Sequence, residues 1–297
     1  MEHGGSMTAS FLPESRASFR ISAPKAGPWN VLCDFDGTIT PFDVTDAILK
    51  AFAHPSWEDV EQEWLDGRIT ARECMERQVG LIKTPAVILD AWLDEAPMTP
   101  GFAEFVRLCK SRGIGLVVVS DGLDHAIRRI LTRHELPNVP VIANRLRYKG
   151  NSAWRLEFPY GAEGCPSGVC KCGVARALGG STLLIGDGRS DCCAAGAVSM
   201  TFARRGKELL RHCADNNLPH LEFDDFHDAA VLLESLISGE TARPEALPGR
   251  EIPRPTETPI RPEIWPAGSA ELAGGREAAA GLLDVVTGVG LGRAFRP

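Results

Sequence analysis

The 297-residue chain contains no apolar run that approaches the ~18 consecutive residues needed to cross a bilayer as a helix. Basic residues number 32 against 39 acidic ones, which gives a formal net charge of −7. A protein that binds nucleic acid usually carries an excess of basic charge on one face. The composition therefore predicts neither a membrane protein nor a nucleic-acid-binding protein. It leaves a small anionic ligand open, because the charge of a cleft can differ from the total.

A secretory signal is also lacking, since residues 1–28 are rich in Ser, Gly and Pro and contain no continuous apolar segment. We predict a disordered extension there. Nine cysteines without such a signal fit a reducing compartment better than a disulfide framework, so we expect a cytoplasmic location. Residues 241–297 begin with a Pro- and Arg-rich stretch without periodicity, which predicts a linker and a weakly structured tail. The sequence does not indicate an oligomeric state.

Between these ends, the chain has the pattern of an α/β protein. From Val44 to about Leu93, apolar residues recur at helical spacing in four short segments separated by turn signals. After residue 100, helical segments alternate with nearly all-apolar segments such as residues 113–120, which are typical of strands buried on both faces of a parallel sheet. The order predicts a doubly wound parallel sheet with a helical bundle inserted after the first strand, residues 29–33. Further strands are expected over residues 139–143, 156–158, 181–186, 200–203 and 221–223.

Polar clusters follow three of the predicted strands directly. The clusters are DFDGT at residues 34–38, SDG at 120–122 and GDGRSD at 186–191. Because the carboxyl ends of parallel strands meet at one edge of a sheet, Asp34, Asp36, Asp187 and Asp191 are expected to crowd together. Like charges at close range repel strongly, and carboxylate and carbonyl oxygens are the ligands that Mg²⁺ prefers. The sequence therefore predicts a Mg²⁺ site at this edge.

The same edge offers the groups that phosphoryl transfer requires. One carboxylate near the metal can attack phosphorus, and a second can transfer protons. A hydroxyl and a lysine should hold the phosphoryl oxygens. Ser120 supplies the hydroxyl, and Lys171 supplies the charge at the predicted start of a helix, whose dipole also favours an anion. We prefer Lys171 over Lys149 and Lys207, because it precedes both a helix and the GDGRSD segment.

The motifs DFDGT, Ser120, Lys171 and GDGRSD, in this order, resemble those of the haloacid dehalogenase (HAD) superfamily of phosphotransferases. The resemblance covers roughly residues 29–240. It implies a catalytic core over residues 29–42 and 99–240, with residues 43–98 forming a helical C1-type cap as in the phosphoserine phosphatase branch. The loop GCPSGVCKC, residues 164–172, is similar to one in the branch that contains the MtnX-like methionine-salvage phosphatases and the phosphoethanolamine/phosphocholine phosphatases.

By this resemblance Asp34 is the nucleophile that forms an aspartyl-phosphate, and Asp36 is the general acid and then the general base. Asp34, Asp187 and the backbone carbonyl of Asp36 would bind Mg²⁺, and Asp191 would orient a metal-bound water or Lys171. The motif residues expected to bind the phosphate are Asp34, Gly37, Thr38, Ser120, Asp121, Gly122 and Lys171.

The implied activity is that of a Mg²⁺-dependent phosphomonoesterase acting on a small cytosolic metabolite, with 2-hydroxy-3-keto-5-methylthiopentenyl-1-phosphate as one candidate substrate. The alternatives are a phosphoserine or phosphoethanolamine/phosphocholine phosphatase, or a phosphotransferase with an acceptor other than water. A non-catalytic regulator on the same fold is a third class, and the intact set of acids argues against it. Asp121 follows Ser120 where phosphoserine phosphatases usually have glycine, which argues against an amino-acid phosphate.

Three features stay open at this level. Asp43, nine residues after Asp34, is either a ligand for a substrate amine, as in phosphoserine phosphatases, or the N-cap of the first inserted helix. Arg77 stands near where those enzymes bind a carboxylate, although we expect it to be solvated. The cysteines before and after Lys171 supply thiolates for zinc but no evident fourth ligand. For these residues, Cys165, Cys170 and Cys172, we expect a packed loop beside the active site instead.

Overall fold

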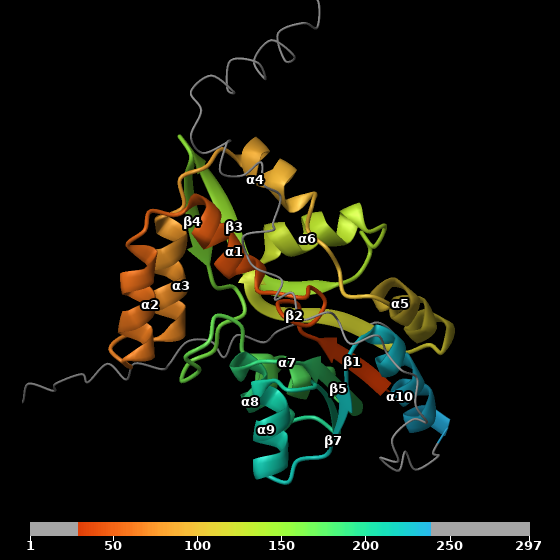
Figure 1. Cartoon of the computed structure of the whole chain (residues 1–297). Helices are drawn as coiled ribbons and strands as arrows, with labels where there is room; N and C mark the ends of the chain where they lie inside the picture. The colour runs from red at the N-terminus through yellow and green to blue at the C-terminus, as the bar shows by residue number, and fades with distance from the viewer. Residues whose placement is uncertain (1–28, 239–297) are drawn as a thin grey trace, which may run out of the picture.

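The structure, a computed structural model, describes residues 29–238 and arranges them around one seven-stranded sheet (Figure 1). The strands lie in the order β4-β3-β2-β1-β5-β6-β7. Their bounds are β1 Trp29–Cys33, β2 Gly115–Leu123, β3 Val141–Gly150, β4 Ala153–Glu157, β5 Ser181–Gly186, β6 Met200–Arg204 and β7 His220–Phe223. The extension predicted over residues 1–28 and the tail predicted over 241–297 lie outside the described residues.

Ten α-helices accompany the sheet within residues 29–238. They are α1 Val44–Phe52, α2 Trp57–Leu65, α3 Ala71–Gly80, α4 Ala86–Leu93, α5 Phe102–Ser111, α6 Asp124–Arg133, α7 Lys171–Leu178, α8 Cys192–Ala195, α9 Glu208–Asp215 and α10 Phe226–Ser238. A short 3₁₀ helix, η1, covers Arg189–Asp191. Over this part of the chain, no helix combines the length and apolar character that crossing a membrane requires.

The strand pairing confirms the predicted parallel sheet, with one antiparallel addition. In the spatial order β3-β2-β1-β5-β6-β7, each strand is parallel to its neighbours. At the edge of the sheet, β4 runs antiparallel to β3. β3 continues well beyond the residues expected for it, because its second half forms a hairpin with β4. Asn151 and Ser152 connect the two strands with φ values of 50° and 59°, the positive values that a tight two-residue hairpin turn requires.

The central strands separate two apolar layers, because successive side chains of a strand point to opposite faces of the sheet. Val31 and Cys33 of β1 pack in the layer that contains residues of α5, α6 and α10. Leu32, between them, packs in the layer that contains residues of α7, α8 and α9. Figure 1 shows these two groups of helices on opposite sides of the sheet. This is the doubly wound arrangement, and it brings the carboxyl ends of β2, β1 and β5 side by side at the centre of the sheet.

The four helices between β1 and α5, here called the α1–α4 segment (residues 44–93), lie where helical spacing predicts them. They do not form a free-standing bundle. α2 and α3 pack together and α3 lies against β4, whereas α4 lies against α6 (Figure 1). Asp94, directly after α4, accepts two hydrogen bonds of 2.5 Å from Arg129 of α6. The segment is therefore anchored to the sheet at two places, the β3–β4 hairpin and α6.

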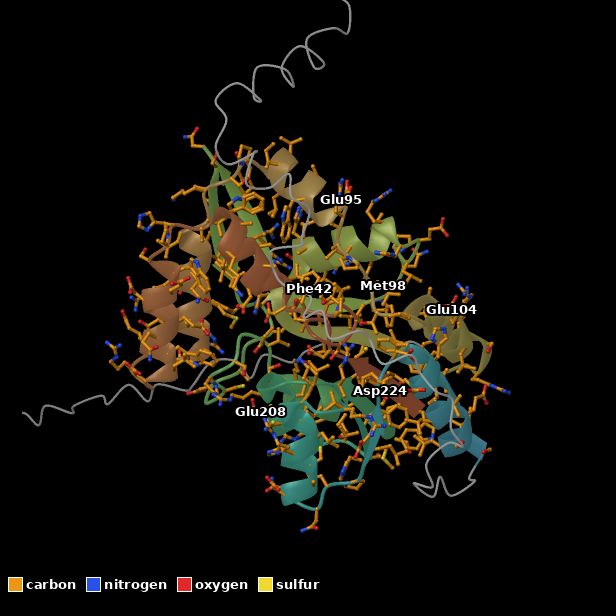
Figure 2. All side chains as sticks on the ribbon, in the orientation of Figure 1. Phe42, Glu95, Met98, Glu104, Glu208 and Asp224 are labelled. Carbon is orange, nitrogen blue, oxygen red and sulfur yellow. The ribbon has the colours of Figure 1, made fainter. Side chains whose placement is uncertain are left out.

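The passage from the sheet to this segment is filled by side chains. Figure 2 shows Phe42 at this passage, between the strand ends and α1. Its ring packs against the larger apolar core and also lines the cavity described below. Phe35, which lies between the two acids of the DFDGT motif, is fully buried in the same core. The apolar residues of this stretch thus hold the polar ones at the sheet edge.

Candidate active site

Three neighbouring strand ends carry the predicted motifs. Asp34 follows β1, Ser120 lies in the last part of β2, and Asp187 follows β5. β1 pairs in parallel with both β2 and β5, and the backbone N–H of Asp34 continues the ladder by donating to the carbonyl of Ile185 at 2.8 Å. The parallel pairing thus brings the three motifs to one edge, as the sequence predicts.

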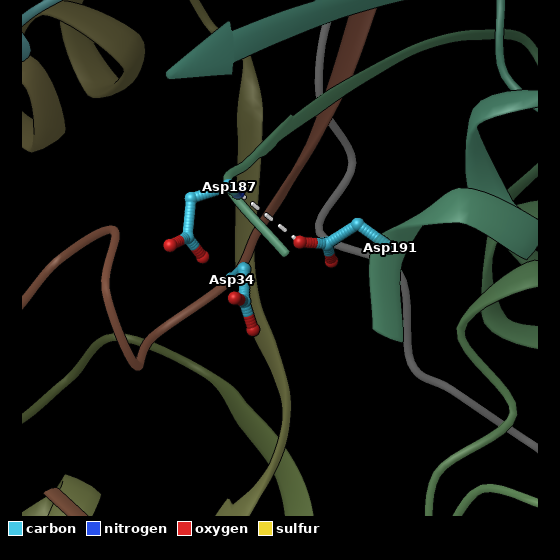
Figure 3. A group of neighbouring side chains, drawn as sticks. All are labelled: Asp34, Asp187 and Asp191. Atoms are coloured by element: carbon cyan, nitrogen blue, oxygen red, sulfur yellow. Dashed lines mark hydrogen bonds between the residues drawn. The ribbon is translucent and has the colours of Figure 1, made fainter. Parts of the chain in front are cut away.

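Three of the four predicted acids form a tight cluster. Asp34, Asp187 and Asp191 each offer a carboxylate oxygen within 4.8 Å of the other two, and Figure 3 shows the side chains converging from two strand ends and a helix start. Burial raises the pKa of Asp34 and of Asp187 above the ordinary range, and the charge of Asp191 adds to both shifts. The cluster therefore gathers negative charge where water is scarce, and a cation would relieve it.

Asp191 is held rigidly within this cluster. Its Oδ2 accepts the backbone N–H groups of Asp187 and Gly188, both at 3.2 Å, as the dashed line to Asp187 shows in Figure 3. Its Oδ1 accepts a hydrogen bond from Lys171. Both oxygens of Asp191 thus accept hydrogen bonds of 3.2 Å or less from the protein, whereas the nearest side-chain contacts of Asp187, with Thr38 and Lys207, are 3.5 and 3.6 Å.

Lys171 lies in the middle of the acids and is almost completely buried. Its Nζ is 2.6 Å from Asp34 Oδ1, 2.7 Å from Asp191 Oδ1 and 3.0 Å from Ser190 Oγ. Burial lowers the pKa of Lys171, but the charges of Asp191 and Asp34 outweigh it and hold the pKa above its ordinary value. The lysine is therefore charged, and one ammonium among three carboxylates leaves an excess of negative charge.

The two alternative lysines lie elsewhere. Lys149 is exposed on the β3–β4 hairpin. Lys207 is also exposed, although its Nζ is 3.6 Å from Asp187 Oδ2 at the wall of the cavity. The structure thus puts Lys171 alone of these three in contact with Asp34.

Asp36 lies apart from the three-acid cluster, beside Ser120. Its Oδ1 accepts the backbone N–H of Val44 at 2.8 Å, and its Oδ2 is 3.5 Å from Ser120 Oγ. Burial raises the pKa of Asp36 well above its ordinary value, and the charge of Asp43 adds to the shift. A Cβ at Gly122 would stand 2.4 Å from Asp36 Oδ2, so glycine is needed there. Asp36 is thus an acid that retains its proton more readily than usual.

The other motif residues support these groups. Gly37 has a φ of +73°, and a Cβ there would stand 2.3 Å from Asp187 Oδ2. The Thr38 hydroxyl donates to Asp187 Oδ1 at 3.5 Å. Ser120 Oγ accepts the backbone N–H of Gly122 at 2.9 Å, which orients the hydroxyl group. The DFDGT turn therefore wraps around Asp187 and packs against it.

Asp121 faces the loop that precedes Lys171. Its Oδ1 accepts the backbone N–H of Val169 at 2.7 Å, and its carbonyl accepts a hydrogen bond from Asn144. Burial raises the pKa of Asp121. The sequence placed this residue among the phosphate ligands, and the structure shows in addition that its side chain ties β2 to the loop.

A cavity of about 880 Å³ connects the acids with the α1–α4 segment. Asp34, Asp36, Ser120 and Asp187 line it from the sheet side. The opposite wall combines acids and an amide, Asp46, Glu61 and Gln78, with apolar and sulfur-containing side chains, namely Phe42, Trp64, Ile69, Cys74 and Met75. The cavity therefore has a charged end, suited to a phosphate with a cation, and a second end that offers apolar surface together with two further acids.

Asp43 combines the two features that the sequence leaves open. Its side chain accepts the backbone N–H of Asp46 at 2.9 Å, so it is the N-cap of α1, and it also lines the cavity. The surrounding protein atoms, and after them the charge of Asp46, raise the pKa of Asp43 to about 6, although the residue keeps contact with solvent. Arg77, by contrast, is paired with Glu63 of α2 through contacts of 2.7 and 3.0 Å.

Sequence reasoning missed two arginines that shape the site. Arg204, at the end of β6, donates to the carbonyl of Gly37 at 2.6 Å, and its position at a strand end was an available signal. Arg72 of α3 donates to the carbonyls of Cys165 and Ser167 at 3.2 and 3.1 Å. No local pattern marks Arg72, because its partners lie more than 90 positions away.

Comparison with known proteins gives matches over the same region. Residues 31–196 match the family model described as haloacid dehalogenase-like hydrolase. A protein of Brevibacillus brevis named 2-hydroxy-3-keto-5-methylthiopentenyl-1-phosphate phosphatase is 32% identical over 216 residues, which are 69% of this chain and 95% of that protein. A protein of the same name from Geobacillus kaustophilus is 32% identical over 214 residues, 69% of this chain and 96% of its own length.

Solved structures share the fold. A phosphoserine phosphatase carrying an analogue of its phospho-aspartyl intermediate aligns with a TM-score of 0.53 and 23% identity, over 72% of this chain and 99% of that one. A HAD family hydrolase from Salmonella enterica serovar Typhi aligns with a TM-score of 0.55 and 18% identity, over 73% of each chain.

Proposed function

The chain belongs to the haloacid dehalogenase-like hydrolase family, and on this basis we propose that it is a Mg²⁺-dependent phosphomonoesterase that works through an aspartyl-phosphate on Asp34. The observation that carries the proposal is the convergence of Asp34, Asp36 and Lys171 at one edge of the sheet. A carboxylate nucleophile, a second carboxyl group that retains a proton and a fixed ammonium are what transfer of a phosphoryl group from an alcohol to water needs.

In the first half of the reaction, Asp34 attacks phosphorus while Asp36 gives its proton to the leaving alcohol oxygen. The raised pKa of Asp36 keeps that proton available. Lys171 holds one oxygen of Asp34, orients the carboxylate and binds the phosphoryl group together with the Ser120 hydroxyl. In the second half, Asp36 accepts a proton from the water that hydrolyses the acyl phosphate. Gly37, Thr38, Asp121 and Gly122 would shape the phosphate site around these groups.

The donor set also fits Mg²⁺. We assign Asp34, Asp187 and the backbone carbonyl of Asp36 as the residues that would hold it, because hard oxygen donors and excess negative charge suit this ion. Asp191 is better suited to orient Lys171, since both of its oxygens already accept hydrogen bonds from the protein. When bound, Mg²⁺ would neutralise and align the phosphoryl oxygens.

For the substrate we propose 2-hydroxy-3-keto-5-methylthiopentenyl-1-phosphate or a close relative, with residues 43–98 acting as the C1-type cap. The apolar wall formed by Trp64, Ile69 and Met75 suits a thioether tail. The candidate carboxylate ligand Arg77 is paired with Glu63 instead, which disfavours phosphoserine. The family and the nine free thiols together favour a reducing, cytoplasmic setting.

The direct test is release of inorganic phosphate from this substrate by the full-length protein with Mg²⁺. The parent protein should turn it over, and Asp34→Asn should lose several orders of magnitude in rate while keeping its fold. Asp59→Asn, a change at an exposed acid of α2, is the matched control and should behave like the parent. Retention of activity within about tenfold in Asp34→Asn would rule out covalent catalysis at that residue.

An amine-bearing substrate such as phosphoethanolamine is the second candidate, because Asp43 lines the cavity and is an acid. If Asp43 pairs with an ammonium group, Asp43→Ala should lower turnover of that substrate on the order of a hundredfold and spare a generic aryl phosphate. If Asp43 only caps α1, both substrates should lose activity equally. We expect the equal loss.

A further inference from the structure

Two cysteines flank the lysine at the centre of the site. Cys170 is the N-cap residue of α7 and Cys172 lies in the first turn, with Lys171 between them. Their Sγ atoms are 3.5 Å apart and both are free thiols. Cys170 is buried, whereas Cys172 is partly exposed. The pair therefore joins an accessible sulfur to a protected one beside the group that contacts Asp34.

The surroundings of the two sulfurs differ in chemistry as well. Arg176, one helical turn further on, places Nη1 3.7 Å from Cys172 Sγ, and the start of α7 adds its positive dipole end. A positively charged, partly exposed setting is where reactive thiols are found. Burial, and after it the hydrogen bond with Cys172, raises the pKa of Cys170 to about 12, so this thiol stays protonated. Cys172 is thus suited to attack an oxidant first, and Cys170 to attack the oxidised sulfur of Cys172 afterwards.

We propose that Cys172 and Cys170 form a hydroperoxide-sensitive thiol pair that closes a disulfide around Lys171 and thereby turns the site off. The regulatory effect rests on the phosphatase function proposed above, whereas formation of the disulfide does not depend on it. Zinc binding is less well supported, because the clusters of potential ligands within 4.8 Å of one another in residues 29–238 include no set of three cysteines.

The chemistry is balanced by a hydroperoxide as the oxidant. The Cys172 thiolate attacks the O–O bond, which releases one alcohol or water molecule after protonation and leaves a sulfenic acid on Cys172. The Cys170 sulfur then attacks the Cys172 sulfur, the hydroxyl leaves as water with the thiol proton, and the S–S bond forms. Two thiols have lost one electron each to the peroxide. An external dithiol reverses the reaction by thiol–disulfide exchange.

The disulfide would reach Lys171 through the backbone. The two sulfurs must approach from 3.5 Å to the S–S bond length of about 2 Å, and only one residue lies between the two cysteines. That residue is Lys171, whose Nζ makes three polar contacts of 3.0 Å or less. A misplacement of about 1 Å in a catalytic site can lower the rate by about a hundredfold. We therefore expect at least a tenfold loss of phosphatase activity.

The experiment treats the full-length protein with hydrogen peroxide and then alkylates the remaining thiols. Trypsin cleaves after Arg155, Lys171 and Arg176, so Cys172 falls in one peptide and Cys170 in another that also carries Cys165. The two peptides remain joined in a non-reducing digest only if a disulfide links them, and fragmentation of the joined pair identifies Cys170 or Cys165 as the partner of Cys172. We expect joined peptides, at least a tenfold loss of phosphate release, and recovery of both on addition of dithiothreitol. Absence of the joined peptides, or a loss that dithiothreitol does not reverse, would overturn the proposal.

Variants identify the pair. Cys170→Ser and Cys172→Ser should keep the activity of the reduced parent and form no joined peptide, and the double variant should resist reversible inactivation. Cys193→Ser is the matched control, because Cys193 is exposed on α8 and its thiol also has a hydrogen bond with Cys172, which makes it the alternative partner. It should switch like the parent. Loss of the switch in Cys193→Ser, or its persistence in the double variant, would contradict the assigned pair.

The two proposals fail in different ways. If the reduced protein releases no phosphate but the peptides become joined on oxidation, the thiol pair stands and the phosphatase function is wrong. If the reduced protein is active and peroxide produces no joined peptides, the phosphatase function stands and the thiol pair is wrong.

Discussion

Lys171 Nζ lies 2.6 Å from Asp34 Oδ1, although the two residues are 137 positions apart in the chain. Lys171 begins α7 and Asp34 directly follows β1, so this contact joins a helix start to the end of the central strand of the sheet. Both side chains are almost fully buried. An ion pair in such a place is costly to break on one side only, because the remaining charge has no water to solvate it.

We expect Lys171→Met to lower both activity and stability. Loss of one partner of a buried ion pair typically destabilises a protein by about 3–5 kcal/mol, and here it would also remove the proposed phosphate ligand. Lys207→Met is the matched control, since Lys207 also lies near an acid of the cluster but is exposed. Denaturant unfolding and phosphate release should show a large loss for Lys171→Met and a small one for Lys207→Met. Equal losses would mean that Lys171 has no special role.

Removal of Mg²⁺ should abolish phosphate release and lower the melting temperature of the parent protein. A ligand that binds only the folded state adds about 2.7 kcal/mol of stability at a hundred times its dissociation constant. In the absence of metal, Asp187→Asn should have a higher melting temperature than the parent, because it removes one of three crowded carboxylates and thereby relieves repulsion. Adding Mg²⁺ should then stabilise the parent more than the variant, as thermal unfolding would show. Undiminished activity in excess chelator would refute the metal site.

Gly122→Ala should lower the rate more than it lowers stability. The added Cβ would stand 2.4 Å from Asp36 Oδ2, and the other oxygen of Asp36 is held by the N–H of Val44. The carboxyl group must therefore move away from the position from which we propose that it transfers protons, with an expected loss of about tenfold or more. Gly196→Ala is the control, because a Cβ there meets no atom within 4 Å. Steady-state kinetics on both variants decide the matter, and a parent-like rate in Gly122→Ala would contradict the assigned role of Asp36.

The ion pair between Asp94 and Arg129 should make part of the free energy of unfolding depend on pH. The hydrogen bonds from Arg129 lower the pKa of Asp94 in the folded state. A carboxyl group with a lowered folded-state pKa stabilises the protein above its unfolded pKa of about 4, and this contribution fades as the pH falls through the folded pKa. Asp94→Asn should thus lose about 0.5–1 kcal/mol at neutral pH, after allowance for partial exposure, and match the parent at pH 2–3.

The control for this comparison is Glu104→Gln, which removes a charge from a more exposed ion pair on α5. It should leave stability unchanged at neutral pH. Urea unfolding at a series of pH values would provide the comparison. A difference between Asp94→Asn and the parent that stays constant down to low pH would show that the pair does not act through charge.

The motifs of the site could be predicted from the sequence because their geometry follows from local rules. A strand that ends in acid, placed in a parallel sheet, must present that acid at the carboxyl edge. This rule predicted that Asp34, Asp36 and Asp187 lie at one edge, as they do, and the position of Lys171 before a helix and ahead of GDGRSD favoured it over Lys149 and Lys207. The apolar strands and the alternation with helices likewise predicted the doubly wound sheet, which the strand order confirms.

The surfaces against which the helices of the α1–α4 segment pack could not be predicted in this way. Helical spacing located the helices, but an apolar stripe does not specify which surface will cover it. The prediction of a bundle was therefore incomplete. α4 packs on α6, and α3 packs on β4, one arm of the β3–β4 hairpin. The sequence pattern predicted two short, separate strands in place of this hairpin. These contacts join segments far apart in the chain and depend on the twist and length of the strands.

The sequence by itself determined the chemistry of this protein, because the identity and order of its acids, serine and lysine are tied to strand and helix ends. Tertiary structure alone decided how those groups are engaged. In the folded protein, the carboxylate of Asp191 accepts hydrogen bonds from Lys171 and two backbone N–H groups. Likewise, Asp121 accepts the N–H of Val169, and Arg204 donates to the carbonyl of Gly37. The physical reason is that a hydrogen bond between distant residues requires distance and direction to be right within a few tenths of an ångström. Those quantities arise only when the layers have packed.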